Sequence, residues 1–303
     1  MNIHSSNKTF ALAALLLFSS SLAASRARQS KHQPANDQPA VLVGAGDISD
    51  CSDPAGAEAT ANLLDQIPGT VFAAGDLAYP DGSKENFLCY DKTWGRAKSR
   101  TRPAPGNHEF HSSGATPYFD YFGAAAGDPK TGYYSYELGS WHIVVLNSEC
   151  KDVGGCNAGS PQEKWLRADL AAHPVACTLA YWHKPLFSSG AKHGNDPEIK
   201  PLWQALYDAS SDVILNGHDH DYERFAPQNP GGIADPARGI REFVVGTGGK
   251  SHRPFGDPKP NSEVRDATAF GVLKLTLRAH SYDWQFLPEA GKSFTDSGSG
   301  ACH

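Results

Sequence analysis

AVLVGAGD at residues 40–47 and TVFAAGD at residues 70–76 are the stretches that decide the fold of this chain. In each, an apolar run typical of a buried strand ends in Gly-Asp. Between them, residues 54–66 carry apolar side chains at helical spacing. This strand–helix–strand order predicts a parallel βαβ unit, with Asp47 and Asp76 at the carboxyl ends of its two strands.

The alternation of strands and helices continues along the chain and then gives way to strands. Residues 133–138 and 141–147 surround a Gly-Ser pair and predict a hairpin. The segments expected next are a helix at 160–172, a strand at 177–182, a helix at 197–209 and strands at 212–215, 240–245, 269–277 and 282–287. The pattern therefore predicts an α/β fold.

Polar side chains follow four of the predicted strands. Asp47 and Asp76 end the first two, His183 follows residues 177–182, and the pair His218 and His220 follows residues 212–215. The carboxyl ends of strands form the ligand crevice of α/β sheets. Carboxylate oxygens and imidazole nitrogens together suit iron, zinc or manganese. The sequence therefore predicts a metal site at this edge.

A fifth polar block, Gly106-Asn107-His108-Glu109, lies between these strand ends. Together the blocks resemble, in this order, the calcineurin-like metallophosphoesterases: Gly46-Asp47, Gly75-Asp76-Leu77-Ala78-Tyr79, Gly106-Asn107-His108-Glu109, Trp182-His183-Lys184-Pro185 and Gly217-His218-Asp219-His220. The position of Tyr79, three residues after Asp76, resembles that of a tyrosine in the purple acid phosphatase branch of that superfamily. Five blocks in order are far more specific than any one of them.

The resemblance implies a dinuclear metal centre. The ligands of the first ion, expected to be Fe(III), would be Asp47, Asp76, Tyr79 and His220. The ligands of the second ion, a divalent Fe, Zn or Mn, would be Asp76 as the bridge together with Asn107, His183 and His218. His108 and His193 would be the catalytic residues that face the substrate, and His108 would help to protonate the leaving oxygen. Ser49 stands where many phosphoesterases carry a His ligand, which leaves the identity of the metals open.

The implied fold is a four-layer sandwich of two mixed β-sheets flanked by helices, with the metals at the strand ends. The implied activity is that of an acid phosphatase, which hydrolyses phosphate monoesters with a hydroxide that two metal ions activate. Two alternatives stay open at this point. The same metal core would serve a phosphodiesterase or nucleotidase, and a secreted binding protein could keep the fold without turnover.

Composition and charge limit the partners. The 303-residue chain carries 33 acidic and 27 basic side chains, a formal net charge of −6 at pH 7, without a dense basic run. Binding of polymeric nucleic acid through its phosphates is therefore not expected. A small phosphate ester is the expected partner, and the oligomeric state is left open.

The first residues are typical of a secretory signal. Lys8 precedes an apolar run over residues 10–18, and small residues follow. We expect a signal peptide at residues 1–25, a disordered leader at 26–38 and a catalytic domain at 39–303. The apolar run is too short to span a bilayer, so the cleaved protein is expected to be secreted or periplasmic, without a membrane anchor.

An exported chain makes its six cysteines candidates for disulfides. Cys150 and Cys156 flank a short flexible loop and are expected to pair. Six cysteines allow fifteen pairings. For the four that remain, we expect Cys51 to pair with Cys89 and Cys177 with Cys302. A zinc cluster is the rival interpretation, but no CxxC spacing supports it.

Overall fold

The computed structural model of the protein describes residues 1, 2, 4 and 38–303. Nearly all of the predicted signal peptide and leader lies outside the described residues, so both stay predictions. Among the described residues, no helix is both long and apolar enough to cross a membrane.

Two mixed β-sheets form the centre of the fold. The first has the strand order β15-β14-β13-β1-β3-β5, and its strands are β1 (Ala40–Ala45), β3 (Thr70–Ala74), β5 (Thr101–Ala104), β13 (Gly271–Arg278), β14 (Ser281–Pro288) and β15 (Ser297–Ala301). The second has the order β12-β10-β11-β9-β8-β7-β6, and its strands are β6 (Tyr134–Leu138), β7 (Trp141–Val145), β8 (Cys177–Tyr181), β9 (Val213–Asn216), β10 (Tyr222–Phe225), β11 (Arg241–Val245) and β12 (Ser262–Asp266). Their apolar faces share one core, in which the rings of Phe72 and Tyr181 lie 5.8 Å apart.

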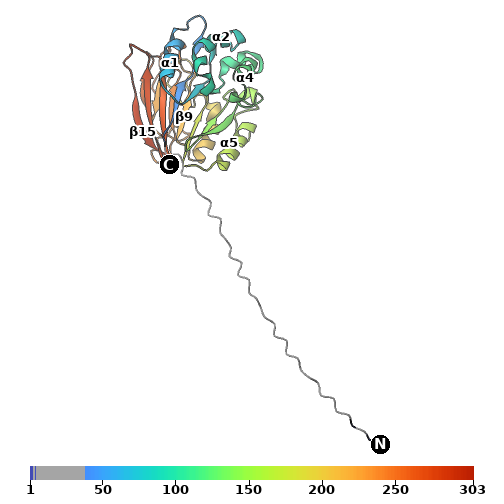
Figure 1. Cartoon of the computed structure of the whole chain (residues 1–303). Coiled ribbons are helices and arrows are strands. Elements are labelled where there is room, and N and C mark those ends of the chain that lie inside the picture. Colours follow the sequence, from blue (N-terminus) through green and yellow to red (C-terminus); the bar gives the residue numbers. More distant parts are fainter. Residues whose placement is uncertain (3, 5–37) are drawn as a thin grey trace. The chain divides into compact units, whose positions relative to one another are not determined.

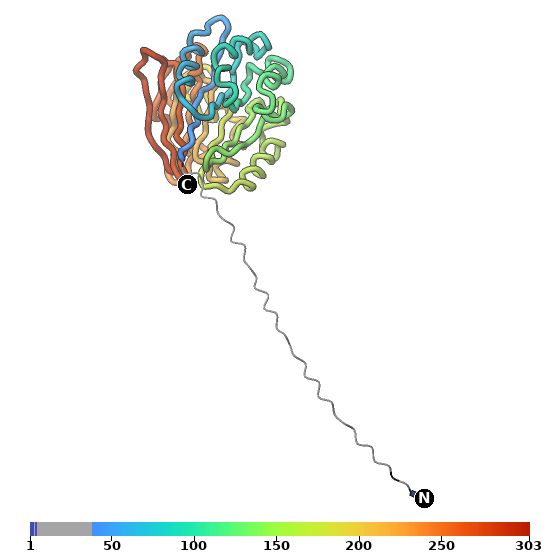
Figure 2. The backbone as a smooth tube through the Cα atoms, viewed as in Figure 1, coloured from blue at the N-terminus to red at the C-terminus, as the bar shows by residue number. Residues whose placement is uncertain are grey.

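The predicted βαβ unit is confirmed. β1 pairs in parallel with β3, and on its other side it pairs antiparallel with β13. Figure 2 shows this arrangement as the blue N-terminal strand running beside the orange and red C-terminal strands. A third, two-stranded sheet pairs β2 (Ser49–Asp50) in parallel with β4 (Ala78–Tyr79), just beyond the ends of β1 and β3.

Helices cover the outer faces of the two sheets. The helices are α1 (Ala55–Gln66), α2 (Lys84–Lys92), α3 (Asn107–His111), α4 (Thr116–Phe122), α5 (Pro161–Ala172) and α6 (Lys200–Asp208). α1 packs beside β13 of the first sheet, and Leu166 of α5 and Leu206 of α6 pack with Val144 and Ala180 on the outer face of the second. Figure 1 shows α5 on the opposite side from β15. The predicted four-layer sandwich is therefore confirmed.

Three disulfides form in the predicted pairing, one within a short loop and two between distant parts of the chain. They join Cys51 to Cys89, Cys150 to Cys156, and Cys177 to Cys302. The last of these holds the C-terminal residues against the start of β8, and β15 precedes it directly. The described residues contain no free cysteine.

An ion-paired cluster fixes α5 to the edge of the second sheet. The buried imidazole of His142 in β7 lies 2.8 Å from Glu137 of β6 through Nδ1 and 2.8 Å from Asp169 of α5 through Nε2. His173 stacks on its ring at 4.4 Å. Burial alone would lower the pKa of His142, but hydrogen bonds to the two carboxylates outweigh it and raise the pKa above its ordinary value of 6.5. The folded protein therefore favours the protonated form of His142 more than the unfolded chain does.

Replacing His142 with Gln is expected to destabilise the fold by about 3 kcal/mol at pH 6, because Asp169 loses a buried ionic partner. A group whose pKa is raised by folding stabilises the folded state fully when the pH is below its pKa in the unfolded chain. This stabilisation is lost as the pH rises through its pKa in the folded chain. The difference in free energy of unfolding between wild type and H142Q, measured by urea unfolding, should thus become smaller from pH 6 to pH 9. H173Q, at the exposed stacked ring, is the control. A gap that stays constant with pH would contradict the ionic role.

Candidate metal centre

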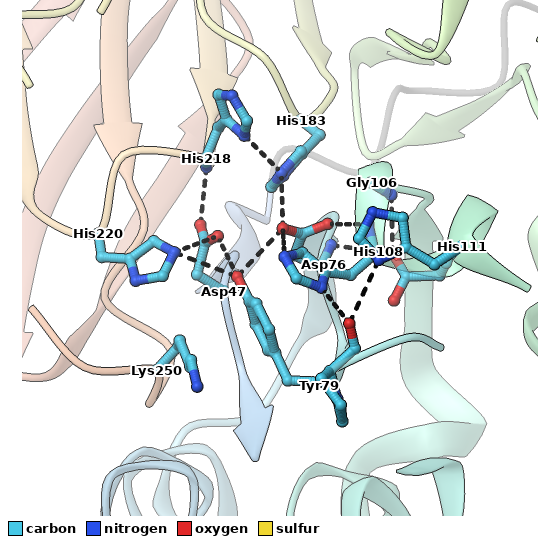
Figure 3. A network of polar contacts seen from close by, with 12 residues as sticks. Asp47, Asp76, Tyr79, Gly106, His108, His111, His183, His218, His220 and Lys250 are labelled. Carbon is cyan, nitrogen blue, oxygen red and sulfur yellow. Dashed lines mark hydrogen bonds and ion pairs between the residues drawn. The ribbon is translucent and has the colours of Figure 1, made fainter. Parts of the chain in front are cut away.

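The carboxyl ends of strands from both sheets meet at one place, and the predicted ligands gather there (Figure 3). Asp47 and Asp76 come two residues after β1 and β3, and His183 comes two residues after β8. The backbone N–H of His218, just after β9, donates to Asp47 Oδ2 at 2.7 Å. Ligand atoms of Asp76, His183 and His218 all lie within 4.8 Å of one another.

The backbone is strained at three of these positions. Asp47, Asp76 and His218 have φ angles of 58°, 51° and 75°, in the left-handed region that residues other than glycine seldom occupy. Such conformations cost on the order of 1–3 kcal/mol each and concentrate at functional sites. Gly106 approaches Asp76 so closely that a side chain there would collide with its backbone and carboxylate. The tight packing brings Asn107, the next residue, to the same edge.

The hydroxyl of Tyr79 lies at the centre of the site. It is 2.8 Å from Asp47 Oδ1, 3.1 Å from Asp76 Oδ2 and 3.2 Å from His220 Nε2 (Figure 3). The side chain is buried, and burial together with the two carboxylates raises the pKa of its phenol well above 10. A phenol has one proton to donate, yet three acceptors surround it. A cation at this point would satisfy them.

The two buried imidazoles are oriented by backbone carbonyls. His220 Nδ1 donates to Ser251 O at 2.7 Å, and His183 Nδ1 donates to Ala74 O at 2.8 Å. Since a carbonyl only accepts, Nε2 is the nitrogen of each ring that faces the centre, where it can bind a metal ion when it carries no proton. His183 Nε2 lies 3.1 Å from Asp76 Oδ2. The amide oxygen of Asn107 is buried, and no donor among residues 38–303 forms a hydrogen bond with it. This set of carboxylate, phenol, amide and imidazole groups fits metal ions.

The buried carboxylates of the site also favour the binding of positive charge. Burial raises the pKa of Asp47 to about 7, and the nearby charge of Asp76 adds to this effect. Burial would do the same to Asp76, but His183 and His108 hold its pKa below the usual range. The pKa of His183 is in turn raised to about 10: burial opposes the proton, but Asp76 and Asp47 favour it. One imidazolium thus balances two buried carboxylates, a role that metal ions would take over.

The two predicted catalytic histidines lie beside the predicted ligands. His108 Nδ1 donates to Pro80 O at 2.5 Å, and its Nε2 lies 3.7 Å from Asp76 Oδ2. The ring of His193 lies 3.9 Å from the ring of His218, with its Nε2 in contact with Arg253. Burial lowers the pKa of His193 to about 4, with Arg253 adding to the shift against the opposing charge of Asp219.

Sequence reasoning missed the positioning role of Glu109. This buried carboxylate accepts hydrogen bonds from the backbone N–H groups of Asp76 at 2.9 Å, Leu77 at 2.8 Å and Gly106 at 2.8 Å. It therefore joins the loop that carries Asp76 to the loop that carries Asn107. A pointer was present in the sequence, since a Glu three residues after the residue that opens a helix can accept the backbone N–H of that residue, as in one half of a capping box.

A model of the calcineurin-like phosphoesterase family matches residues 30–222. The chain belongs to this family. It is 27% identical over 249 residues to purple acid phosphatase 18 of Arabidopsis thaliana, an alignment that covers 72% of this chain and 54% of the relative. It is also 27% identical over 291 residues to the Fe(3+)-Zn(2+) purple acid phosphatase 12 of the same plant, covering 82% and 60%. The chain spans about half the length of the curated relatives it matches.

A solved structure has a similar fold. The structure of the purple acid phosphatase PPD1 from yellow lupin (Lupinus luteus) seeds superposes with a TM-score of 0.72 at 18% identity, over 88% of this chain and 55% of that one. At this identity the likeness concerns the fold alone. The predicted resemblance to the purple acid phosphatase branch is confirmed, and the chain is a metallophosphoesterase of that type. A dinuclear metal centre is consistent with this family.

Proposed function

We propose that this phosphoesterase is an exported acid phosphatase that hydrolyses small phosphate monoesters at an Fe(III)–divalent metal centre. The observation that carries the proposal is the convergence of Asp47, Asp76 and His220 on the Tyr79 hydroxyl, all within 3.2 Å. A phenolate ligand favours ferric iron over a divalent ion, because its negative charge stabilises the higher oxidation state. The three disulfides support export to an oxidising compartment.

Two overlapping sets of residues would hold the ions. The set for Fe(III) is Asp47, Asp76, Tyr79 and His220, and the set for the divalent Fe, Zn or Mn ion is Asp76, Asn107, His183 and His218. Asp76 belongs to both sets because its Oδ2 lies 3.1 Å from the Tyr79 hydroxyl of the first set and 3.1 Å from His183 Nε2 of the second. Its Oδ1 accepts the backbone N–H of His108, which holds the carboxylate in place. When bound, the ions supply an activated water and neutralise phosphate charge.

The protein's own residues then orient the ester and manage its proton. The carbonyl of Pro80 holds Nδ1–H of His108, which leaves Nε2 free to serve the leaving oxygen. His193 lies on the side of His218, so it and His108 would contact the substrate from two sides. Asn107 would contribute a neutral oxygen ligand, which keeps the net charge of the site favourable for an anionic ester.

Visible absorption together with metal content tests this proposal. Purified protein should contain about two metal ions per chain, including one iron, and show a phenolate-to-iron absorption band in the visible range. Tyr79→Phe should abolish the band while keeping the fold, because only the buried hydroxyl is lost. Tyr90→Phe is a matched control, since Tyr90 is equally buried and its hydroxyl has no hydrogen-bond partner in the described structure.

The substrate half of the proposal is tested with p-nitrophenyl phosphate and bis(p-nitrophenyl) phosphate between pH 4 and pH 8. We expect a higher kcat/KM for the monoester and an acidic optimum. A colourless protein that is fully active with two divalent ions would overturn the iron assignment. Faster hydrolysis of the diester would favour a phosphodiesterase, and a metal-poor protein without turnover would indicate a binding protein.

A further inference from the structure

Arg253 lies beside the metal site and, unlike Lys184 and Lys250, has no carboxylate partner in the described residues. Lys250 pairs with Asp50, and Lys184 lies 2.9 Å from Glu149 Oε2. Within residues 38–303, no carboxylate oxygen forms an ion pair with the guanidinium of Arg253. Its one side-chain hydrogen bond in this part of the chain is donated by Nη1 to the neutral acceptor His193 Nε2. The positive charge of Arg253 is therefore uncompensated beside the site.

The position of this guanidinium is fixed from two directions. The backbone N–H of Arg253 donates to the carbonyl of His220 at 3.2 Å. The ring of His193, which holds the guanidinium, lies 3.9 Å from the ring of His218. Next along the chain, the carbonyl of Pro254 accepts the N–H of Ala191 at 3.1 Å, which joins the two loops that carry the pair. Arg253 is thus tied to both histidines of the His-x-His block.

The hydrogen-bond chemistry shows what is left for a ligand. His193 must present a lone pair to Arg253, so this imidazole is an acceptor that orients the guanidinium. Nη1 of Arg253 uses one N–H in this contact, the other guanidinium N–H groups form no hydrogen bond within residues 38–303, and the residue as a whole is half-buried. Such a fork binds two oxygens of one phosphoryl group, which a lysine ammonium cannot do with the same geometry.

We propose that Arg253 is a specificity-determining residue that binds non-bridging oxygens of the substrate phosphoryl group and selects monoester dianions over diester monoanions. A diester has one negative charge fewer and one non-bridging oxygen fewer, so it gains less from an uncompensated guanidinium. His193 is the positioning residue for Arg253 in this arrangement. The inference rests on the proposed phosphatase function and deepens it, because it names the group that would discriminate between the two ester classes.

The test compares full-length, metal-loaded Arg253→Gln, Arg253→Lys and wild-type protein. R253Q should lower the ratio of kcat/KM for p-nitrophenyl phosphate over bis(p-nitrophenyl) phosphate by about tenfold, mainly through KM for the monoester. R253K should recover part of this loss, because it restores the charge without the fork. Lys192→Gln is the matched control, since it removes one charge from the exposed neighbour of His193 and should change the ratio less than about twofold.

Binding of inorganic phosphate separates this inference from the proposed function. Calorimetric titration should show a Kd for phosphate about tenfold weaker in R253Q than in wild type, even if neither ester is hydrolysed. Unchanged phosphate affinity in a folded R253Q protein would overturn the role of Arg253, whether or not the enzyme turns over. An equal loss in K192Q would also overturn it, because the effect would then come from the general field rather than from contact.

Discussion

Asp76→Asn is expected to lower kcat/KM for a phosphate monoester by on the order of 10³-fold and to reduce the metal content of the protein. Asp76 is the residue shared by both proposed ligand sets, and its carboxylate contacts Tyr79, His183 and the backbone of His108. Asn keeps the shape and one acceptor oxygen but removes the negative charge. It also tolerates the left-handed backbone at this position better than most residues.

Metal analysis and steady-state kinetics on the same preparation check this prediction. Asp65→Asn is the control, because Asp65 makes the same kind of ion pair, with Arg96, but lies exposed on α1. D65N should keep wild-type activity and metal content. Full metal occupancy with wild-type kcat/KM in D76N would show that Asp76 neither bridges the ions nor contributes to catalysis.

Much of the fold followed from the sequence because its signals are local. The runs before Asp47 and Asp76 are apolar, short and ended by Gly-Asp, so both the strands and their carboxyl ends could be placed. The helix between them has regular spacing, and the structure starts it at Ala55, within one residue of the prediction. Export predicted that the cysteines form disulfides, and loop length predicted the Cys150–Cys156 pair; the other two pairs were chosen among the remaining pairings, and the structure forms all three.

The short elements could not be predicted, since they form only when distant segments meet. β2 and β4 have two residues each and exist because the ends of β1 and β3 lie side by side. β15 is a Ser- and Gly-rich strand with mostly exposed side chains, and its pairing with β14 rather than its own hydrophobicity defines it. Such strands carry no periodic pattern of their own.

The candidate site also contains residues that the sequence could indicate and residues that it could not. Its proposed ligands follow strands and stand in recognisable blocks, so residue type and order were enough to single them out. Glu109 and Arg253 act through contacts that the chain order does not reveal. Glu109 accepts backbone N–H groups about 30 residues away in the loop of Asp76, and Arg253 meets a histidine 60 residues distant. These contacts depend on loop geometry, which one sequence does not specify.

His108→Ala is expected to slow hydrolysis of an alkyl phosphate such as glycerol phosphate by on the order of 10²-fold or more, and of p-nitrophenyl phosphate by less than about tenfold. An alkoxide is a poor leaving group and needs a proton as the ester bond breaks, whereas p-nitrophenolate leaves without one. The carbonyl of Pro80 holds the Nδ1–H of His108, so Nε2 is the atom that would deliver the proton. Its ring packs 4.2 Å from the ring of Tyr79, which fixes its direction.

His111→Ala is the matched control for this experiment. The exposed ring of His111 lies 4.7 Å from that of His108, and its Nδ1 reaches the same carbonyl at 3.3 Å, but it has no contact with Asp76 in the described structure. H111A should affect both esters equally and weakly. If H108A, at unchanged metal content, slows the hydrolysis of both esters equally, His108 does not donate a proton to the leaving oxygen and only binds phosphate. The difference between the two esters therefore decides between acid catalysis and binding, which a single substrate cannot do.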